Sequence, residues 1–174
     1  MQAVRLIVSL LLGLGLAFVL IGFFVPEVEF NSSIDVNAPV DQAFAVYTDE
    51  SRMGEWLTDF ISIENISGGP LQVGSRRRLV FEGEGGEEIE MIQEVTDYEA
   101  LRHFGSVLES DDVRVGSHTR FFSDGAGGTR IELSSRLKGK TWYMRSLLPL
   151  FKGHMQQRQD EDFERLRDLI ETTL

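Results

Sequence analysis

The 174-residue sequence contains no cysteine, which excludes disulfides, thiolate catalysis and thiolate metal sites. Basic residues are also scarce: 17 lysines and arginines stand against 28 aspartates and glutamates, and the formal net charge is −11. Nucleic acid and anionic headgroups repel a chain of this charge, so we expect no nucleic-acid partner. No glycine-rich phosphate loop follows a predicted strand, and the three histidines lack metal-ligand spacing. The sequence therefore predicts neither a cofactor nor a metal.

Charged side chains are absent from residues 6–25, LIVSLLLGLGLAFVLIGFFV. About twenty helical residues span roughly 30 Å of hydrocarbon, which predicts a single-pass transmembrane helix within an anchor of residues 1–26. A cleaved signal peptide is the alternative, but its apolar core normally runs only about 7–15 residues before small residues at the cleavage site. Arg5 precedes the span, and Glu27 and Glu29 follow it. The positive-inside tendency then predicts an extracytoplasmic domain.

Residues 27–174 have the size of one domain. Apolar and polar residues alternate from Val28 to Val36, the period of a half-buried strand. A short helix is predicted after Pro39, and a second one carries Trp56. Glycine-rich turns then separate six further predicted strands, at residues 61–66, 75–82, 87–96, 101–109, 113–123 and 129–137.

The segment from Trp142 to Leu174 is the longest that can form one helix in this domain. One side of that helix is apolar, and it carries Leu147, Leu148, Phe151, Met155, Phe163, Leu166, Leu169 and Ile170. Pro149 predicts a kink near the start. An antiparallel sheet of about seven strands must curl around so long a helix to bury its apolar stripe, so we expect an α+β domain.

Three polar residues, Arg158, Gln159 and Asp162, interrupt the apolar stripe between Met155 and Phe163. We call these three residues the polar notch. A buried charge without partners is unfavourable, so the notch must be paired or hydrated. One interpretation is an ion pair between Arg158 and Asp162 at the i, i+4 spacing. The other is that this side of the helix faces a cavity.

Several segments resemble the START and Bet v 1-like (SRPBCC) superfamily, and within it the polyketide cyclase/dehydrase and lipid transport group. They are residues 34–44 (IDVNAPVDQAF), Trp56, the Gly74-Ser75 and Gly128-Thr129 pairs that precede strands, and the terminal helix. The resemblance covers residues 28–174. It implies a helix-grip fold with a cavity between the curved sheet and the terminal helix. This scaffold serves lipid carriers, hormone receptors, cyclases and oligomerisation modules, so the resemblance is more specific for fold than for function.

The implied cavity and the polar notch together define the candidate ligand-binding residues. They are Trp56, Phe60, Leu79, Phe81, Met91, His103, Phe121, Met155, Gln159 and Phe163, with Arg158 and Asp162 as orienting polar groups. This mixture suits an apolar ligand with one polar end, although ordinary core packing uses the same residue types. If the domain is an enzyme, His103 or Asp162 is the candidate acid or base.

Two further groups of residues have alternative interpretations. His103 and His118 are expected to come close on neighbouring strands across a turn at Asp111-Asp112, as an acid/base pair or as partly exposed strand residues. In Arg76-Arg77-Arg78, alternation sends Arg77 to one face of its strand and its two neighbours to the other. The cluster either forms charge pairs with acidic residues on the paired strand or attracts a ligand carboxylate or phosphate.

Three functions are consistent with these patterns. The first, which we expect, is a membrane-anchored binding or carrier domain for a hydrophobic small molecule or lipid. The second is an enzyme of the cyclase or dehydrase kind, acting in the same cavity. The third is a protein-interaction module with a solid core and an apolar surface patch, tethered to the membrane.

Overall fold

The computed structural model describes residues 2–25 and 27–173, so the predicted anchor boundary at residue 26 lies outside the described residues. The helices are α1 (Gln2–Phe24), α2 (Val40–Thr48), the 3-10 helix η1 (Glu50–Arg52), α3 (Met53–Trp56) and α4 (Trp142–Thr172). The strands are β1 (Glu27–Val36), β2 (Phe60–Ser67), β3 (Arg76–Glu82), β4 (Glu88–Glu99), β5 (His103–Glu109), β6 (Val113–Ser123) and β7 (Thr129–Gly139).

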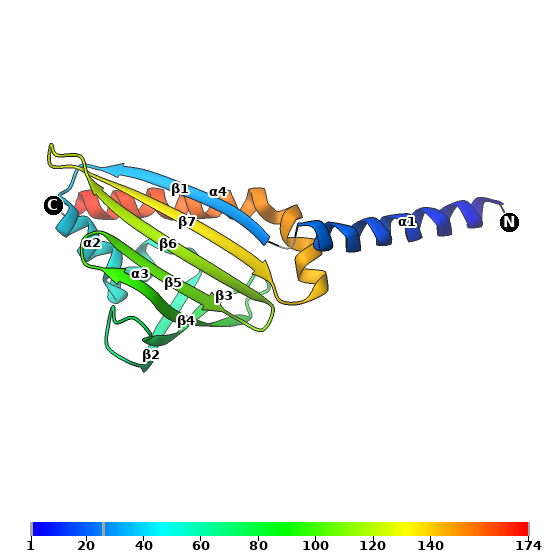
Figure 1. Cartoon of the computed structure of the whole chain (residues 1–174), viewed down its shortest axis with the longest axis horizontal. Coiled ribbons are helices and arrows are strands. Elements are labelled where there is room, and N and C mark those ends of the chain that lie inside the picture. Colours follow the sequence, from blue (N-terminus) through cyan, green and yellow to red (C-terminus); the bar gives the residue numbers. More distant parts are fainter. Residues whose placement is uncertain (1, 26, 174) are drawn as a thin grey trace.

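The strands form one antiparallel sheet of seven strands in the order β1-β7-β6-β5-β4-β3-β2. The sheet curves around α4, and α2 and α3 close one end of it (Figure 1). This arrangement is the helix-grip fold, and it confirms the predicted element order, the strand number and the two short segments that follow the first strand.

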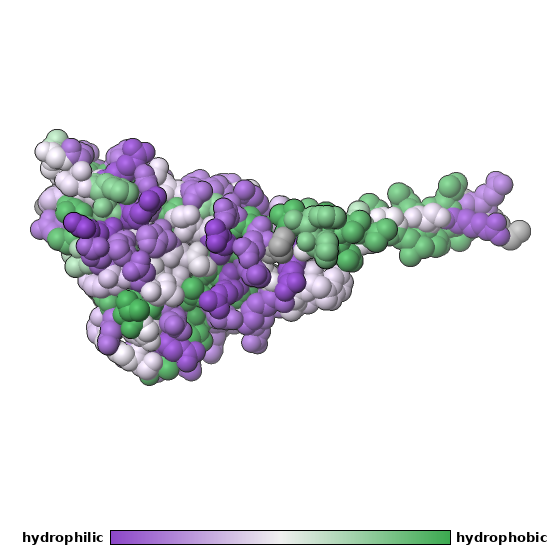
Figure 2. Space-filling view, in the orientation of Figure 1, coloured by the Kyte–Doolittle hydropathy of each residue, from purple (hydrophilic) through white to green (hydrophobic). Residues whose placement is uncertain are grey.

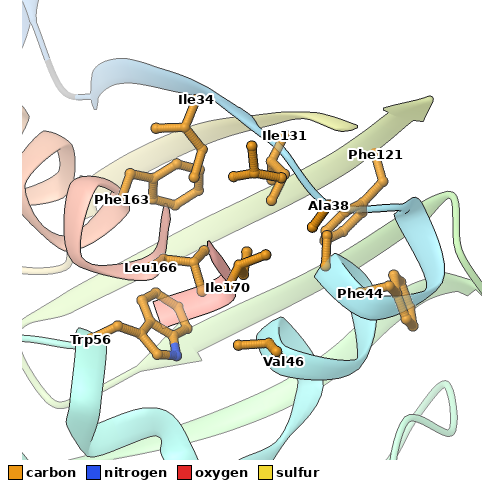
Figure 3. Close-up of a cluster of buried hydrophobic side chains, with 12 residues drawn as sticks. Ile34, Ala38, Phe44, Val46, Trp56, Phe121, Ile131, Phe163, Leu166 and Ile170 are labelled. Carbon is orange, nitrogen blue, oxygen red and sulfur yellow. The ribbon is translucent and has the colours of Figure 1, made fainter. Parts of the chain in front are cut away.

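The main hydrophobic core lies where α2, α3 and the C-terminal half of α4 meet the inner face of the sheet. Figure 3 shows Phe163 and Leu166 of α4 directed toward Ile34, Ile131 and Trp56. The alternation in the first and last strands creates this face, because Ile34 and Ile131 are register partners and both are buried. A second, smaller cluster of buried residues comprises Val28, Phe30, Leu137 and Leu148.

Helix α4 runs without interruption through Pro149, and its first turns lie at an angle to the remainder (Figure 1). A proline inside a helix removes one backbone hydrogen bond and crowds the previous turn, which explains the change of direction. Thr141 caps the helix by accepting a hydrogen bond from the backbone nitrogen of Met144. The predicted long helix with an early kink is therefore confirmed.

Helix α1 projects from the domain at the end opposite the C-terminus (Figure 1). Residues Val4–Phe24 are long and apolar enough to cross a membrane, judged by length and composition. The last turns of α1 pack on the first turns of α4: Gly22 is buried, and a Cβ added there would lie 2.8 Å from the backbone nitrogen of Ser146. The ring of Phe18 meets that of Trp142 edge to face, with centroids 6.4 Å apart. The last turns of α1 and the first turns of α4 are thus in close contact. We call this contact, around Gly22 and Ser146, the joint between α1 and α4.

Candidate ligand-binding site

A row of polar side chains crosses the inner face of the sheet, and all of them except the half-buried Ser117 are buried. Ser135 of β7 is aligned with Ser117 of β6, which is aligned with Ser106 of β5. Gln93 of β4 continues the row, since its Nε2 lies 3.5 Å from the hydroxyl of Ser106, and its register partner on β3 is Arg77. The inner face is therefore not purely apolar, because a polar line runs through it.

Arg77 lies at the end of this row with only 3% of its side chain exposed. Its Nη1 atom contacts Oε1 of Glu50, on η1, at 2.6 Å. Its neighbours Arg76 and Arg78 lie on the outer face, where Arg78 pairs with Glu64 and Glu90. The predicted division of the arginine cluster between two faces is thus confirmed, and Arg77 is the member that enters the protein.

Several polar atoms on this side of the sheet are buried and have no hydrogen-bond partner among the residues that the structure describes. They are Arg77 Nη2, Gln93 Oε1, Ser75 Oγ and Trp56 Nε1. Each unpaired buried group of this kind raises the free energy of the folded state by about 1–3 kcal/mol. Arg77 of β3 is paired in register with Gln93 of β4, and Ser75 immediately precedes β3. The unpaired polar atoms of these three residues are therefore concentrated in one place.

Four of the predicted ligand-binding residues are buried, and three of them belong to a core cluster. Trp56, Phe121 and Phe163 belong to the main cluster, with exposed fractions of 5%, 5% and 1%. Leu79 is equally buried, at 2%. These side chains are held by protein neighbours, as the core-packing alternative expects.

Other predicted residues are only partly covered. Helix α4 packs mainly on β1, with further contacts to β7, so the inner side of β2, β3 and β4 is less protected. Phe60, Phe81 and Met91 are half-buried there, and the rings of Phe60 and Phe81 meet edge to face with centroids 6.0 Å apart. Met155 of α4 is also half-buried and packs against the smaller core cluster. Phe60, Phe81 and Met91 therefore leave apolar surface on the same face of the sheet as Arg77.

The polar notch of α4 is satisfied by partners from other elements. Nη2 of Arg158 contacts Oδ2 of Asp59 at 2.7 Å and donates to the carbonyl oxygen of Thr58 at 3.1 Å. Gln159 donates to the hydroxyl of Ser32 at 2.9 Å and accepts from that of Ser135 at 2.6 Å. The notch therefore fastens α4 to the loop after α3 and to the sheet.

Asp162, the third residue of the notch, accepts hydrogen bonds from the backbone nitrogen and hydroxyl of Thr58, at 3.0 and 2.6 Å. It also pairs with Arg165. Burial raises the pKa of the Asp162 carboxyl, and the Thr58 hydrogen bonds oppose that shift only in part. The predicted ion pair between Arg158 and Asp162 is not present, because Asp59 and Arg165 take those positions.

The structure corrects the prediction for His103. Its strand neighbour Phe104 is buried on the inner face and packs on Tyr47, so alternation turns His103 to the outer face. His103 therefore does not share a space with Asp162, which lies on the inner side. The predicted approach of His103 and His118 is confirmed, since their rings stack with centroids 5.4 Å apart.

Two surface hollows are found among the residues that the structure describes. One, of about 490 Å³, follows the side of α4 between Gly153 and Arg165. The other, of about 430 Å³, lies among charged side chains of the outer face that include Arg76, Glu90 and Lys140. Neither contains a predicted ligand-binding residue, so the case for a site on the inner face rests on its unpaired polar groups.

Residues 27–171 match the family described as polyketide cyclase / dehydrase and lipid transport. No curated protein sequence matches the chain. Among solved structures, a START superfamily protein from Mycobacterium smegmatis is 14% identical with a TM-score of 0.69, over 84% of this chain and 99% of that one.

Two further structures are similar. The Zhui aromatase/cyclase from Streptomyces sp. R1128 is 15% identical with a TM-score of 0.68, covering 83% of this chain and 94% of that chain. Ara h 8.0201 is 12% identical with a TM-score of 0.66, covering 83% and 97%. Identities this low show a common fold and leave the ligand open.

Proposed function

Since the chain belongs to the polyketide cyclase/dehydrase and lipid transport family, we propose that it is a membrane-anchored domain that binds an amphiphilic small molecule or lipid. Family and fold together support a hydrophobic ligand-binding or cyclase/dehydrase-like domain. In the proposed arrangement the polar end of the ligand contacts Arg77, and the apolar part of the ligand lies along the half-buried side chains of β2, β3 and β4.

The observation that carries this proposal is the buried guanidinium of Arg77, with Nη2 unpaired among the described residues. Glu50 neutralises the charge through Nη1 and leaves hydrogen-bonding capacity in place. A carboxylate or phosphate oxygen is the natural acceptor for an arginine N–H, because charge-assisted bonds of this kind are short and strong. The neighbouring Ser75, whose hydroxyl is buried and unpaired among the described residues, can donate a second hydrogen bond to the same headgroup.

The apolar part of the ligand has a matching surface. Phe60, Phe81 and Met91 are half-buried on the same side of the sheet as Arg77, and Leu79 lies between Arg77 and Phe81 along β3. Covering these side chains would remove apolar surface from water, which contributes about 25 cal/mol per Å² of area buried. A polar end at Arg77 and an apolar body on these residues together describe an amphiphile.

The joint between α1 and α4 supports exchange with a bilayer. Trp142, Tyr143, Leu150 and Phe151 at the start of α4 are 64%, 40%, 62% and 50% exposed, next to the apolar surface of α1 that Figure 2 shows. Aromatic side chains of this kind favour the membrane–water interface. The first turns of α4 would then touch the bilayer when α1 spans it. From the position of Arg5 we place the N-terminus in the cytoplasm and the domain outside.

Trp56 makes a direct test possible, because the chain has only two tryptophans. In the full chain with Trp142→Phe, reconstituted in uncharged lipid nanodiscs, the remaining tryptophan is Trp56, which lies on α3 far from α1 (Figure 1). Dibrominated fatty acid should quench Trp56 in a saturable manner, while the unbrominated acid should not. Bromines in the bilayer are too distant from Trp56 to quench it, so quenching would report fatty acid bound inside the domain. Absence of quenching would refute the proposal.

The filled core around Phe163 favours one other candidate, an interaction module tethered to the membrane. Such a module has no interior ligand. It therefore predicts that brominated fatty acid leaves the fluorescence of Trp56 unchanged, and the same experiment separates the two functions.

A further inference from the structure

Three side chains from three neighbouring strands meet on the outer face of the sheet. They are Asp97 of β4, His103 of β5 and His118 of β6. Nε2 of His103 lies 3.0 Å from Oδ2 of Asp97, and Nε2 of His118 lies 3.4 Å from the same oxygen. Each residue offers one possible ligand atom, and the three atoms lie within 4.8 Å of one another.

The backbone is shaped to bring these groups together. Val95 points to the inner face, and regular alternation would place Asp97 there too. A β-bulge between Val95 and Asp97 adds a residue and turns Asp97 outward. Gly105 is the register partner of both Asp97 and His118. The bulge and the glycine thus lie side by side in the sheet, at the position where the three side chains meet.

Gly105 leaves the space in which the cluster forms. A Cβ added to it would lie 3.1 Å from Cβ of Asp97 and 3.4 Å from Cδ2 of His118. Such an atom would displace Asp97 by a few tenths of an ångström and would fill the space beside His118. The three groups therefore converge above the one position that has no side chain.

We propose that Asp97, His103 and His118 form a binding site for a divalent transition-metal cation, with Zn²⁺ as the best match. Two imidazoles and a carboxylate are a donor set that zinc accepts in proteins. Ligand atoms about 2.0–2.1 Å from a tetrahedral zinc ion lie about 3.3 Å from one another. The separations of 3.0 and 3.4 Å from Asp97 to the two histidines fit that geometry, and the third separation, between the histidines, is at most 4.8 Å.

The surroundings of the cluster suit a cation. A carboxylate oxygen of Glu99 lies 3.9 Å from Nδ1 of His103, which is too far for a hydrogen bond but adds negative charge beside the cluster. Arg120, the register partner of His103, is paired with Glu132. The Asp97 and His118 side chains are 54% and 44% exposed, so an ion and a water ligand can reach them.

The site lies on the face of the sheet opposite Arg77, so it does not depend on the proposed ligand. Its residues are far apart in sequence and come together only through strand pairing, a bulge and a glycine, which explains why sequence spacing predicted no metal. Three protein ligands leave at least one coordination position open, as in zinc sites that bind water or substrate.

Zinc titration of the untagged full chain in detergent, after removal of metals with a chelator, tests the site. Isothermal titration calorimetry should show one tight Zn²⁺ site per chain. Asp97→Asn, His103→Gln and His118→Gln should each lower the zinc affinity by more than about 100-fold. This is more than the loss of about 10–100-fold that is typical when a residue that only supports a metal ligand is replaced. Glu99→Gln should weaken zinc binding less than these three variants do, because it removes only a neighbouring negative charge.

His154→Gln is the matched control, because His154 is exposed on α4 and is the third histidine of the chain. This variant should bind zinc like the parent. Co²⁺ should give the intense visible bands of a tetrahedral site in the parent, and Gly105→Ala should lose them. The proposal is wrong if the three ligand variants, folded as judged by circular dichroism, bind zinc as the parent does. It is equally wrong if His154→Gln abolishes binding.

Discussion

Nη1 of Arg77 lies 2.6 Å from Oε1 of Glu50, which ties the inner face of β3 to the 3-10 helix that precedes α3. The Arg77 side chain is 3% exposed and that of Glu50 is 36% exposed. Removing an arginine from water offsets most of the attraction between such partners, so a buried ion pair contributes little net stability. The proposed ligand gives Arg77 a reason to lie inside the sheet that folding stability does not supply.

Replacement of Arg77 by methionine tests this explanation. Arg77→Met keeps an apolar stem and leaves Glu50 unpaired but 36% exposed, so water can solvate it and the free energy of unfolding should fall by less than the roughly 3–5 kcal/mol that breaking a fully buried pair costs. Quenching of Trp56 by brominated fatty acid should nevertheless be lost. Arg76→Met, on the outer face, is the control and should keep the quenching. Full quenching in Arg77→Met would show that the headgroup binds elsewhere.

Asp162 should make stability depend on pH. Burial raises its pKa in the folded protein above the unfolded value, so the folded state binds the proton more tightly. The parent should therefore lose stability relative to Asp162→Asn as pH rises through the ordinary aspartate range of about 3.9 and on to the raised pKa. Asparagine can still accept the hydrogen bonds from Thr58. Thermal unfolding of both proteins from pH 3 to 7 measures the difference, and a constant difference would contradict the prediction.

Regular patterns in the sequence were sufficient for the fold. The alternation of Val28 to Val36 and of residues 129–137 identified the two strands that pair at one edge of the sheet, and the apolar stripe identified α4. These patterns work because burial on one side imposes a period of two in a strand and 3.6 in a helix.

Side-chain partners were harder to predict than elements. Alternation separated Arg77 from its neighbours but did not indicate which face is inside, and the partner Glu50 belongs to another element. The face of His103 cannot be read from the sequence, since the strand of residues 101–109 has apolar residues at both parities and only the sheet register assigns Phe104 to the core. The partners of Arg158 lie about a hundred positions away in the chain, where no local pattern connects them.

The joint between α1 and α4 should fail when Gly22 gains a side chain. A Cβ there would lie 2.8 Å from the backbone nitrogen of Ser146, so Gly22→Leu forces the helices apart and should lower stability by about 1–3 kcal/mol. Gly13→Leu is the matched control, since an added Cβ meets nothing within 4 Å. In Trp56→Phe protein, brominated lipids should quench Trp142 strongly, and Gly22→Leu should reduce that quenching. Equal quenching in the two leucine variants would show that the joint does not hold Trp142 at the bilayer.

The orientation of the chain can be measured because it contains no cysteine, so a single introduced thiol is the only one to react. Ala126→Cys places the thiol on the exposed turn before β7, and Gln2→Cys places it at the exposed start of α1. If Arg5 keeps the N-terminus in the cytoplasm, a membrane-impermeant maleimide should label the Ala126→Cys protein in right-side-out vesicles. It should label the Gln2→Cys protein only after detergent is added. The reverse pattern would place the domain in the cytoplasm, and labelling of both without detergent would show that α1 does not cross the membrane.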